Sequence, residues 1–281
     1  MRQINSTDPL GPNAERQDGP HPHQAVLDPT GRFFVVNDLG TDTLLVLDSD
    51  QDQFEVVNRV RVTPDGCGPR HGVFLPRAAE PAQATHYLLV CELLNMVEVF
   101  SLSYADNNLQ FVPTQVISSF GQDAPPANAS TATAGEIALS SDSQDVYVSN
   151  RNTGNETDAI SHFRVLPASE DAPLSLEFSQ SISSAGVHPR MFSLSGDETL
   201  LFSTNQFAGQ GLMALARNGG TLAAPGAGQG FDVQADAGEV SAAVEGKGTL
   251  VDAPVAAVGL DVFGEEEAGP LFVLQISVVS E

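Results

Sequence analysis

The chain has 281 residues, of which 41% are hydrophobic, so it can form one large all-β domain or two small ones with a sizeable core. Its net charge of −24 repels phosphate backbones and argues against a nucleic-acid partner. No apolar run approaches the roughly 20 residues of a membrane helix, and the N-terminus has no signal-peptide pattern. We therefore expect a cytoplasmic protein without a membrane partner, although secretion stays open if the natural N-terminus lies upstream.

Residues 1–19 are polar and are predicted to form a loop. A first group of four short strands follows, because the apolar runs are four to six residues long and are bounded by turn residues. Asp28-Pro29-Thr30-Gly31 separates the first two strands and fits a type I turn, with Pro second and Gly fourth. The four predicted strands cover residues 24–27, 32–37, 43–47 and 54–62.

Three further groups follow in chain order. The second begins at Gly68 and has strands near residues 72–75, 86–91, 96–102 and 109–117, with an insertion at 76–85. The third covers 136–142, 145–149, 159–165 and 174–182. The fourth covers 189–194, 200–204 and 212–216. Beyond Arg217 the pattern weakens, but the runs at 253–262 and 271–279 are further candidate strands.

A motif repeats along these groups: the second strand of each ends in a polar cluster, at steps of about 55 residues. Such a period indicates one supersecondary unit copied along the chain, and four short strands per copy are typical of a propeller blade. We predict an all-β protein, with a single β-propeller domain over residues 20–281. Its four-stranded antiparallel blades begin near residues 20, 68, 135 and 188, and a divergent tail begins near residue 217.

Several motifs together resemble the seven-bladed β-propeller lactonases, a family that includes propeller-type 6-phosphogluconolactonases and fungal 3-carboxy-cis,cis-muconate lactonising enzymes. The resemblance covers residues 20 to about 216. The motifs are His23-Gln24-Ala25-Val26-Leu27-Asp28-Pro29-Thr30-Gly31, Asn37-Asp38-Leu39-Gly40, Gly68-Pro69-Arg70-His71, Cys91-Glu92-Leu93, Ser149-Asn150-Arg151-Asn152 and Pro189-Arg190-Met191-Phe192.

The resemblance implies seven blades, which need near 350 residues at roughly 50 residues each. We therefore expect an incomplete propeller with about five of seven blades, whose missing part precedes Met1. By motif match, the resemblance also implies an active site formed by four residues: His23, Arg70, Glu92 and Arg151.

The repeat itself predicts where polar side chains meet. In a blade, the start of the first strand and the end of the second lie on one face near the axis. When the four copies are aligned on their turns, the first strands start at His23, Arg70, Gly135 and Arg190. The ends align Asp38, Glu92, Asn150 with Arg151, and Asn205 with Gln206.

Arginines in these rows would give an acidic protein a local positive focus for an anion, because guanidinium groups bind carboxylate or phosphate with two hydrogen bonds. Glu92 or His23 is predicted to be the general acid/base, with the other orienting it, while Arg70 and Arg151 bind the anion and support the oxyanion. We also expect substrate contacts from five further residues: His21, His71, Arg190, Asn150 and Gln206.

These residue types need neither a metal nor a cofactor, and no Cys/His cluster has zinc-ligand spacing. The leading hypothesis is a metal-independent lactonase of the 6-phosphogluconolactonase type that acts on a small anionic lactone. Carboxymuconate cycloisomerase activity is an alternative, because arginine serves phosphate and carboxylate alike, and a non-catalytic propeller scaffold is another. The oligomeric state is left open.

The two cysteines, Cys67 and Cys91, allow one disulfide. Two free, half-buried thiols are nevertheless the prediction from the sequence.

Overall fold

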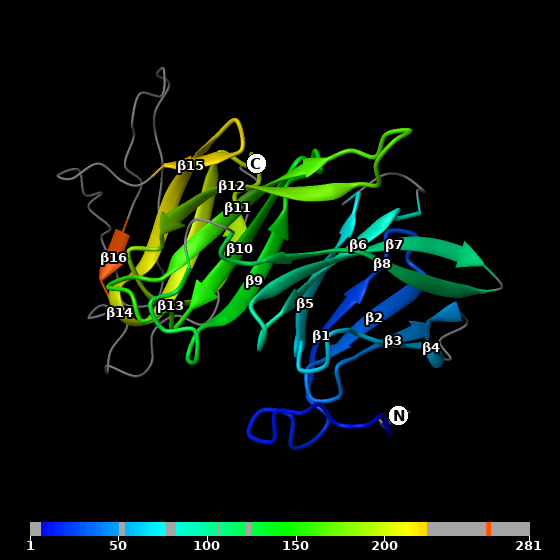
Figure 1. Cartoon of the computed structure of the whole chain (residues 1–281). Coiled ribbons are helices and arrows are strands. Elements are labelled where there is room, and N and C mark those ends of the chain that lie inside the picture. Colours follow the sequence, from blue (N-terminus) through cyan, green and yellow to red (C-terminus); the bar gives the residue numbers. More distant parts are fainter. Residues whose placement is uncertain are drawn as a thin grey trace, which may run out of the picture.

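A computed structural model describes residues 7–50, 54–76, 83–105, 107–121, 125–223 and 257–259. The secondary-structure elements within these ranges are all β-strands. They form four sheets that follow one another along an arc (Figure 1). Neighbouring strands in each sheet are antiparallel. The prediction of an all-β propeller built from four-stranded blades is therefore confirmed.

The first two sheets have the simple up-and-down order that the sequence predicted. The first sheet contains β1 (Pro22–Leu27), β2 (Phe33–Asp38), β3 (Thr43–Asp48) and β4 (Glu55–Arg61). The second contains β5 (Pro69–Leu75), β6 (His86–Cys91), β7 (Met96–Ala105) and β8 (Asn108–Ser118).

The third sheet follows the same order, with β9 (Thr133–Leu139), β10 (Asp145–Arg151), β11 (Ala159–Leu166) and β12 (Ser175–Ser183). The fourth differs. It pairs β13 (Gly186–Leu194), β14 (Leu200–Asn218) and β15 (Thr221–Ala223), and β16 (Ala257–Gly259) joins β14.

The predicted break between strands at residues 204 and 212 is wrong, because β14 is one continuous strand. It stays extended because β13 starts as early as Gly186 and pairs with β14 as far as Gly209. Of the candidate strands in the tail, only residues 257–259 are described, and the run at 271–279 lies outside the described residues.

Aspartate side chains fix the turns between first and second strands. The Asp28 carboxylate accepts hydrogen bonds from the backbone N–H groups of Thr30, Arg32 and Phe33. Asp142 accepts from the Gln144 N–H in the equivalent turn of the third sheet. Aspartate suits this position because its short carboxylate bonds to the backbone of its own turn. Both residues are thus turn residues, which the sequence analysis had predicted for Asp28 from the Asp28-Pro29-Thr30-Gly31 motif.

The first strands of the sheets form the inner wall, since β1 contacts β5, β5 contacts β9 and β9 contacts β13. Apolar side chains fill the space between successive sheets in three clusters, one for each neighbouring pair. Burying one Leu or Phe side chain is worth about 1.5–3 kcal/mol, so these interfaces hold the inner strands in place.

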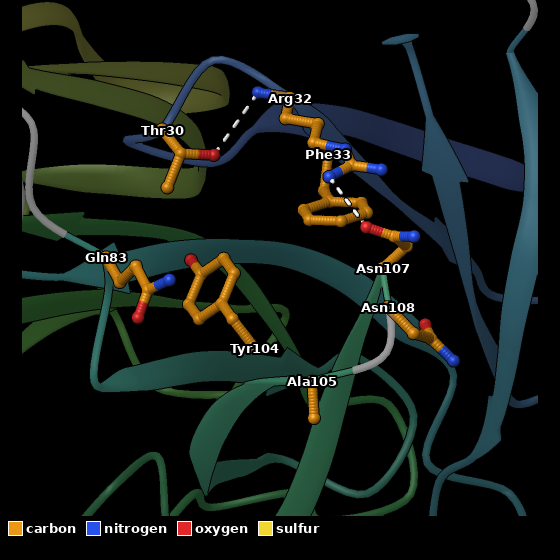
Figure 2. Close-up of a pocket in the computed structure, with 8 residues that line it drawn as sticks. All are labelled: Thr30, Arg32, Phe33, Gln83, Tyr104, Ala105, Asn107 and Asn108. Carbon is orange, nitrogen blue, oxygen red and sulfur yellow. Dashed lines mark hydrogen bonds between the residues drawn. The ribbon is translucent and has the colours of Figure 1, made fainter.

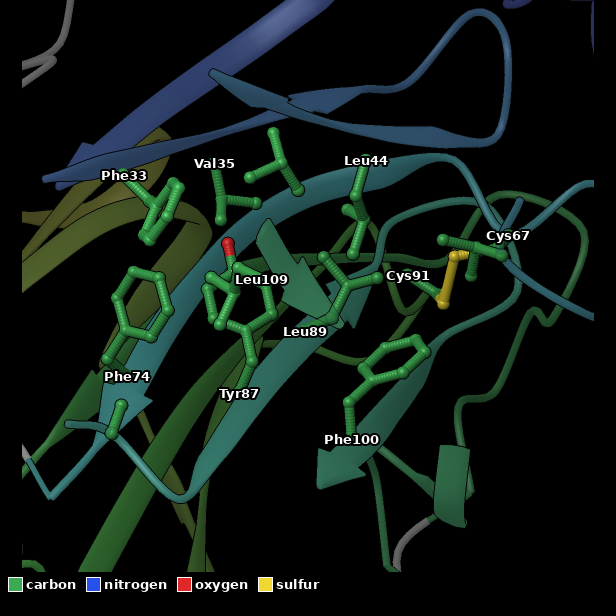
Figure 3. Close-up of a cluster of buried hydrophobic side chains, with 13 residues drawn as sticks. Phe33, Val35, Leu44, Cys67, Phe74, Tyr87, Leu89, Cys91, Phe100 and Leu109 are labelled. Atoms are coloured by element: carbon green, nitrogen blue, oxygen red, sulfur yellow. A yellow bond between two sulfur atoms is a disulfide. The ribbon is translucent and has the colours of Figure 1, made fainter. Parts of the chain in front are cut away.

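The cluster between the first two sheets includes a disulfide between Cys67 and Cys91 (Figure 3). The prediction of free thiols is wrong. Pro69 pairs with Cys91 across β5 and β6, so Cys67, just before β5, reaches the end of β6. The sequence separation of 24 residues gives no hint of this contact, which arises from the hairpin.

The segment before β1 lies against the turn between β2 and β3. The Gln17 side chain is buried there and donates to the Leu39 carbonyl and the Asp42 carboxylate. The Gly11 N–H donates to the Gly40 carbonyl. This loop therefore covers the face on which the first strands start. No helix in the described residues is long and apolar enough to span a membrane.

Candidate active site

Glu92 lies directly after β6 and is the centre of a buried ion cluster. Its Oε2 is 2.8 Å from Arg70 Nε and 3.0 Å from Arg151 Nη2, and Arg16 from the N-terminal segment pairs with its Oε1. Burial by itself raises the pKa of Glu92, but the charges of Arg151, Arg70 and Arg16 outweigh it and lower that pKa to about 2. Glu92 therefore stays ionised and holds three guanidinium groups together.

Backbone carbonyls at the start of β9 fix the two inner arginines. Arg70 Nη1 donates to the Gly135 carbonyl at 2.9 Å, and Arg151 Nη2 donates to the Ala134 carbonyl at 2.7 Å. A Cβ on Gly135 would stand 3.1 Å from Arg151 Nε and 2.4 Å from Ser149 Oγ. The third copy thus has glycine in the predicted row because the Arg151 side chain crosses at that point.

The pairing between first and second strands shifts by one residue near the start of every first strand. In β1 the shift leaves His23 without a cross-strand partner, and in β13 it leaves Arg190 without one. The shifts in β5 and β9 fall at Arg70–His71 and at Gly135–Glu136. Such bulges commonly redirect side chains beside active sites. The four copies therefore present these residues at equivalent places, as the sequence predicted.

Three of these residues form a hydrogen-bonded chain. Glu136 Oε1 lies 2.9 Å from His71 Nδ1, and His71 Nε2 lies 3.1 Å from His23 Nδ1. Glu136 and His71 are buried, whereas His23 is half-buried. Burial is the largest cause of a lowered pKa at His23, followed by the charge of Arg70, and together they bring that pKa to about 3. His23 is therefore a neutral imidazole at pH 7.

The fourth sheet contributes His188 and Arg190. Burial and then the Arg151 charge lower the pKa of His188 to about 4, and its ring lies 4.6 Å from that of the exposed Phe207. After burial and nearer charges, Arg190 also lowers the pKa of His23 and His188, so its guanidinium faces the same region. Arg190 is half-buried and makes no ion pair or side-chain hydrogen bond within the described residues. The Arg190 guanidinium is therefore available to form hydrogen bonds with a ligand.

The other predicted contact residues do not join this cluster. His21 is about half exposed and pairs with Asp18. Asn150 is fully buried and bonds to Ser119 and Ser161, so its amide ties strands together. Gln206 is buried on β14, and no ion pair or hydrogen bond connects it to the arginines in the described part of the chain.

A pocket of about 390 Å³ lies at the opposite ends of the strands, beside the β1–β2 turn and the end of β7 (Figure 2). Among the described residues that line it, Arg32 is the only positively charged one, and it is already paired with Asp48. Tyr104 donates its hydroxyl to Asp28. None of the residues predicted for chemistry lines this pocket, so the ion cluster around Glu92 is the better candidate for the active site. Within the described residues, no group of His, Cys, Asp and Glu is arranged to hold a metal ion.

The sequence matches a known family. The model of the seven-bladed β-propeller lactonases matches residues 2–233. The chain belongs to this family. Over 138 residues it is 39% identical to a protein of Arthroderma benhamiae named "Probable 6-phosphogluconolactonase", which covers 49% of this chain and 32% of that relative.

Two solved structures resemble this lactonase-family chain. A protein from Lactobacillus plantarum has a TM-score of 0.64 at 27% identity and covers 79% of this chain and 59% of its own. The periplasmic gluconolactonase of Pseudomonas aeruginosa has a TM-score of 0.59 at 28% identity and covers 73% and 53%. The chain thus spans between about a third and three-fifths of the length of these relatives.

Sequence reasoning missed three members of the cluster: Arg16, Glu136 and His188. Arg16 lies in a non-repeating loop, and no periodic signal marks it. Glu136 stands one residue after Gly135 of the predicted row, so allowing for a one-residue bulge at the strand start would have included it. His188 stands two residues before Arg190, outside the reach of such a shift.

Proposed function

We propose that this chain hydrolyses a small anionic sugar lactone of the 6-phosphogluconolactone type, using its own side chains and no metal ion. One observation carries the proposal: Arg190 is half-buried, has no side-chain partner among the described residues, and acts electrostatically on a neutral His23 next to three guanidinium groups that share one carboxylate. Four guanidiniums against Glu92 and Glu136 leave local positive charge in a protein of net charge −24. Such a focus attracts an anionic substrate.

His23 fits the general-base role better than Glu92, although the sequence left both open. Both carboxylate oxygens of Glu92 are already paired with arginines, so Glu92 has no oxygen left to accept a proton from water. His23 is neutral and half-buried, with one ring nitrogen left for a water molecule. It would take a proton from water as the water oxygen attacks the lactone carbonyl carbon.

The arginines divide the remaining work. Arg190 is free to bind the phosphate or carboxylate of the substrate with two hydrogen bonds. Arg70 and Arg151 are almost fully buried, so they act mainly through their positive potential on the developing oxyanion. Their pairing with Glu92 keeps them fixed before the substrate arrives.

The experiment compares turnover of 6-phosphogluconolactone and of unphosphorylated gluconolactone, each above its spontaneous hydrolysis. We expect Arg190→Ala to raise KM for the phosphorylated lactone by about tenfold to a hundredfold, since a charge-assisted contact is worth roughly 1.5–3 kcal/mol. KM for the neutral lactone should change little. Arg164→Ala removes an exposed arginine on β11 and is the matched control.

Two outcomes would contradict the proposal. Equal effects of Arg190→Ala on KM for both lactones would show that Arg190 does not bind the anionic group of the substrate. No turnover of either lactone by the folded protein, with turnover of 3-carboxymuconate instead, would favour the cycloisomerase reaction, and turnover of none would favour a scaffold.

A further inference from the structure

The chain of Glu136, His71 and His23 contains two titratable groups that the hydrolysis described above does not use. His71 lies between the other two side chains and contacts each within hydrogen-bond distance, at 2.9 Å and 3.1 Å. The residues come from three successive first strands, β9, β5 and β1. Such a line of donors and acceptors across three blades leads from the face that carries Arg190 to a buried carboxylate.

With Glu136 ionised and His71 neutral, the two hydrogen bonds determine which ring nitrogens carry protons. An ionised Glu136 can only accept, so His71 donates through Nδ1–H, and its Nε2 is then an acceptor in the neutral ring. His23 must therefore donate through Nδ1–H, which leaves the lone pair on His23 Nε2 available. This is the tautomer that a general base needs, and Glu136 determines it through the intervening His71 ring.

We propose that Glu136 and His71 form a proton relay for His23, an inference that rests on the lactone hydrolysis proposed above. His23 is the catalytic base. His71 and Glu136 are positioning residues that also accept the proton in turn.

The step balances as follows. His23 Nε2 takes a proton from the attacking water while the water oxygen bonds to the lactone carbonyl carbon. His23 Nδ1–H passes to His71 Nε2, and His71 Nδ1–H passes to Glu136 Oε1. When the ring C–O bond breaks, the protons return along the same line and His23 Nε2–H protonates the leaving oxygen. The net reaction adds one water and yields the hydroxy acid.

Electrostatics supply the reason for a relay. The charged and titratable groups that act on His23 are Arg70, His71, Glu92 and Arg190, and the positive ones disfavour an imidazolium. A relay avoids a positively charged His23 ring close to the arginines, because the proton ends on the Glu136 carboxylate and both imidazole rings remain neutral. Glu136 Oε1 already accepts from the Ile137 N–H, and its buried Oε2 has no hydrogen-bond partner within the described residues.

The first test needs no activity. Nitrogen-15 NMR of the six imidazole rings at pH 7 distinguishes protonated from unprotonated ring nitrogens. We expect both His23 and His71 to be neutral Nδ1–H tautomers. Glu136→Ala should abolish that preference in His71 and His23, whereas Glu136→Gln should preserve it, because its amide oxygen still accepts. An Nε2–H tautomer at His23, or a doubly protonated His71, would overturn the relay.

The second test measures proton transfer. We expect Glu136→Gln to lower kcat at least about tenfold with KM unchanged, because the amide holds the tautomer but cannot take up the proton. In mixtures of H2O and D2O, kcat of the wild type should follow a curved dependence on deuterium content, as for several moving protons. The dependence for the variant should be linear. Glu98→Gln alters another buried carboxylate, on β7, and is the matched control.

The two proposals fail in different ways. If the tautomers are as expected but no lactone is hydrolysed, the proposed function is wrong and the hydrogen-bonded arrangement stands. If lactone is hydrolysed but Glu136→Gln matches the Glu98→Gln control in kcat and isotope dependence, the relay is wrong and the proposed function stands.

Discussion

At the residue scale, the charged side chains of the site fall into two groups: those that pair with Glu92 and stabilise the site, and Arg190, which we propose binds the substrate. Glu92 is 3% exposed and contacts Arg16, Arg70 and Arg151, whereas Arg190 has no such partner in the described residues. Removing one partner of a buried ion pair leaves the other charge uncompensated. The structure therefore assigns Glu92 a holding role that the residue type alone does not reveal.

Glu92→Gln should destabilise the fold by about 3–5 kcal/mol, because buried arginines lose their shared counter-charge. Urea unfolding measures this loss. Arg16→Ala should cost less than about 1 kcal/mol, since the Arg16 side chain is 43% exposed and Glu92 keeps two other partners. Glu98→Gln serves as the buried-carboxylate control. A Glu92→Gln protein as stable as that control would show that the ion cluster does not support the fold.

At the element scale, the second blade presents its site residues from two strand ends joined by a disulfide. Cys67 and Cys91 join the start of β5 to the end of β6, next to Arg70 and Glu92. Backbone hydrogen bonds from Glu92 N–H to Gly68 and from Leu93 N–H to Cys67 tie the same two ends. The local geometry is thus supported by covalent, backbone and ionic links together.

The double variant Cys67→Ala, Cys91→Ala should lose about 3 kcal/mol of stability, the amount expected for a loop of 24 residues. We expect kcat on the lactone at 25 °C to stay within about twofold, because the backbone and ionic links remain. Denaturant unfolding and steady-state kinetics of the double variant and the oxidised wild type check both points. A large loss of kcat without a loss of stability would mean that the disulfide positions Arg70 and Glu92 directly.

At the scale of the whole molecule, stability depends on the interfaces between blades, and one of them contains a carboxylate. Glu98 on β7 is 1% exposed, and alternation along the strand puts it on the face of Met96, which packs against the core between the first two blades. Burial raises the pKa of Glu98 to about 7. Its Oε2 has no hydrogen-bond partner among the residues described.

This carboxylate should weaken the fold as pH rises. Between its unfolded pKa near 4.5 and about 7, the folded protein holds the proton and the unfolded chain does not, so stability falls with rising pH. Glu98→Gln cannot ionise and should be more stable than the wild type at pH 8, by up to about 3 kcal/mol, with the advantage vanishing near pH 4. Unfolding by urea at several pH values measures the difference, in which the shared contributions of His23 and His188 cancel. A difference independent of pH would show that Glu98 does not titrate in this range.

Much of this molecule was predictable from local patterns. The strands, the aspartate turns and the repeat follow from short apolar runs, turn residues and a fixed period, which are properties of neighbouring residues. The repeat also placed His23, Arg70, Arg190 and Glu92 at one face, because equivalent positions in copied blades must meet near the axis.

Other features depended on contacts between distant segments, which no local pattern encodes. The Cys67–Cys91 disulfide needed the β5–β6 register, and the bond from Arg16 to Glu92 needed the N-terminal segment to pack against the first blade. The bulges set which of two adjacent residues faces the site, and so brought in Glu136 beside the predicted Gly135. The sequence by itself determined the repeat and the residue types at its strand ends. Only the tertiary structure decided which charges pair with each other and which, like Arg190, have no partner among the described residues, because pairing depends on distance and burial between blades.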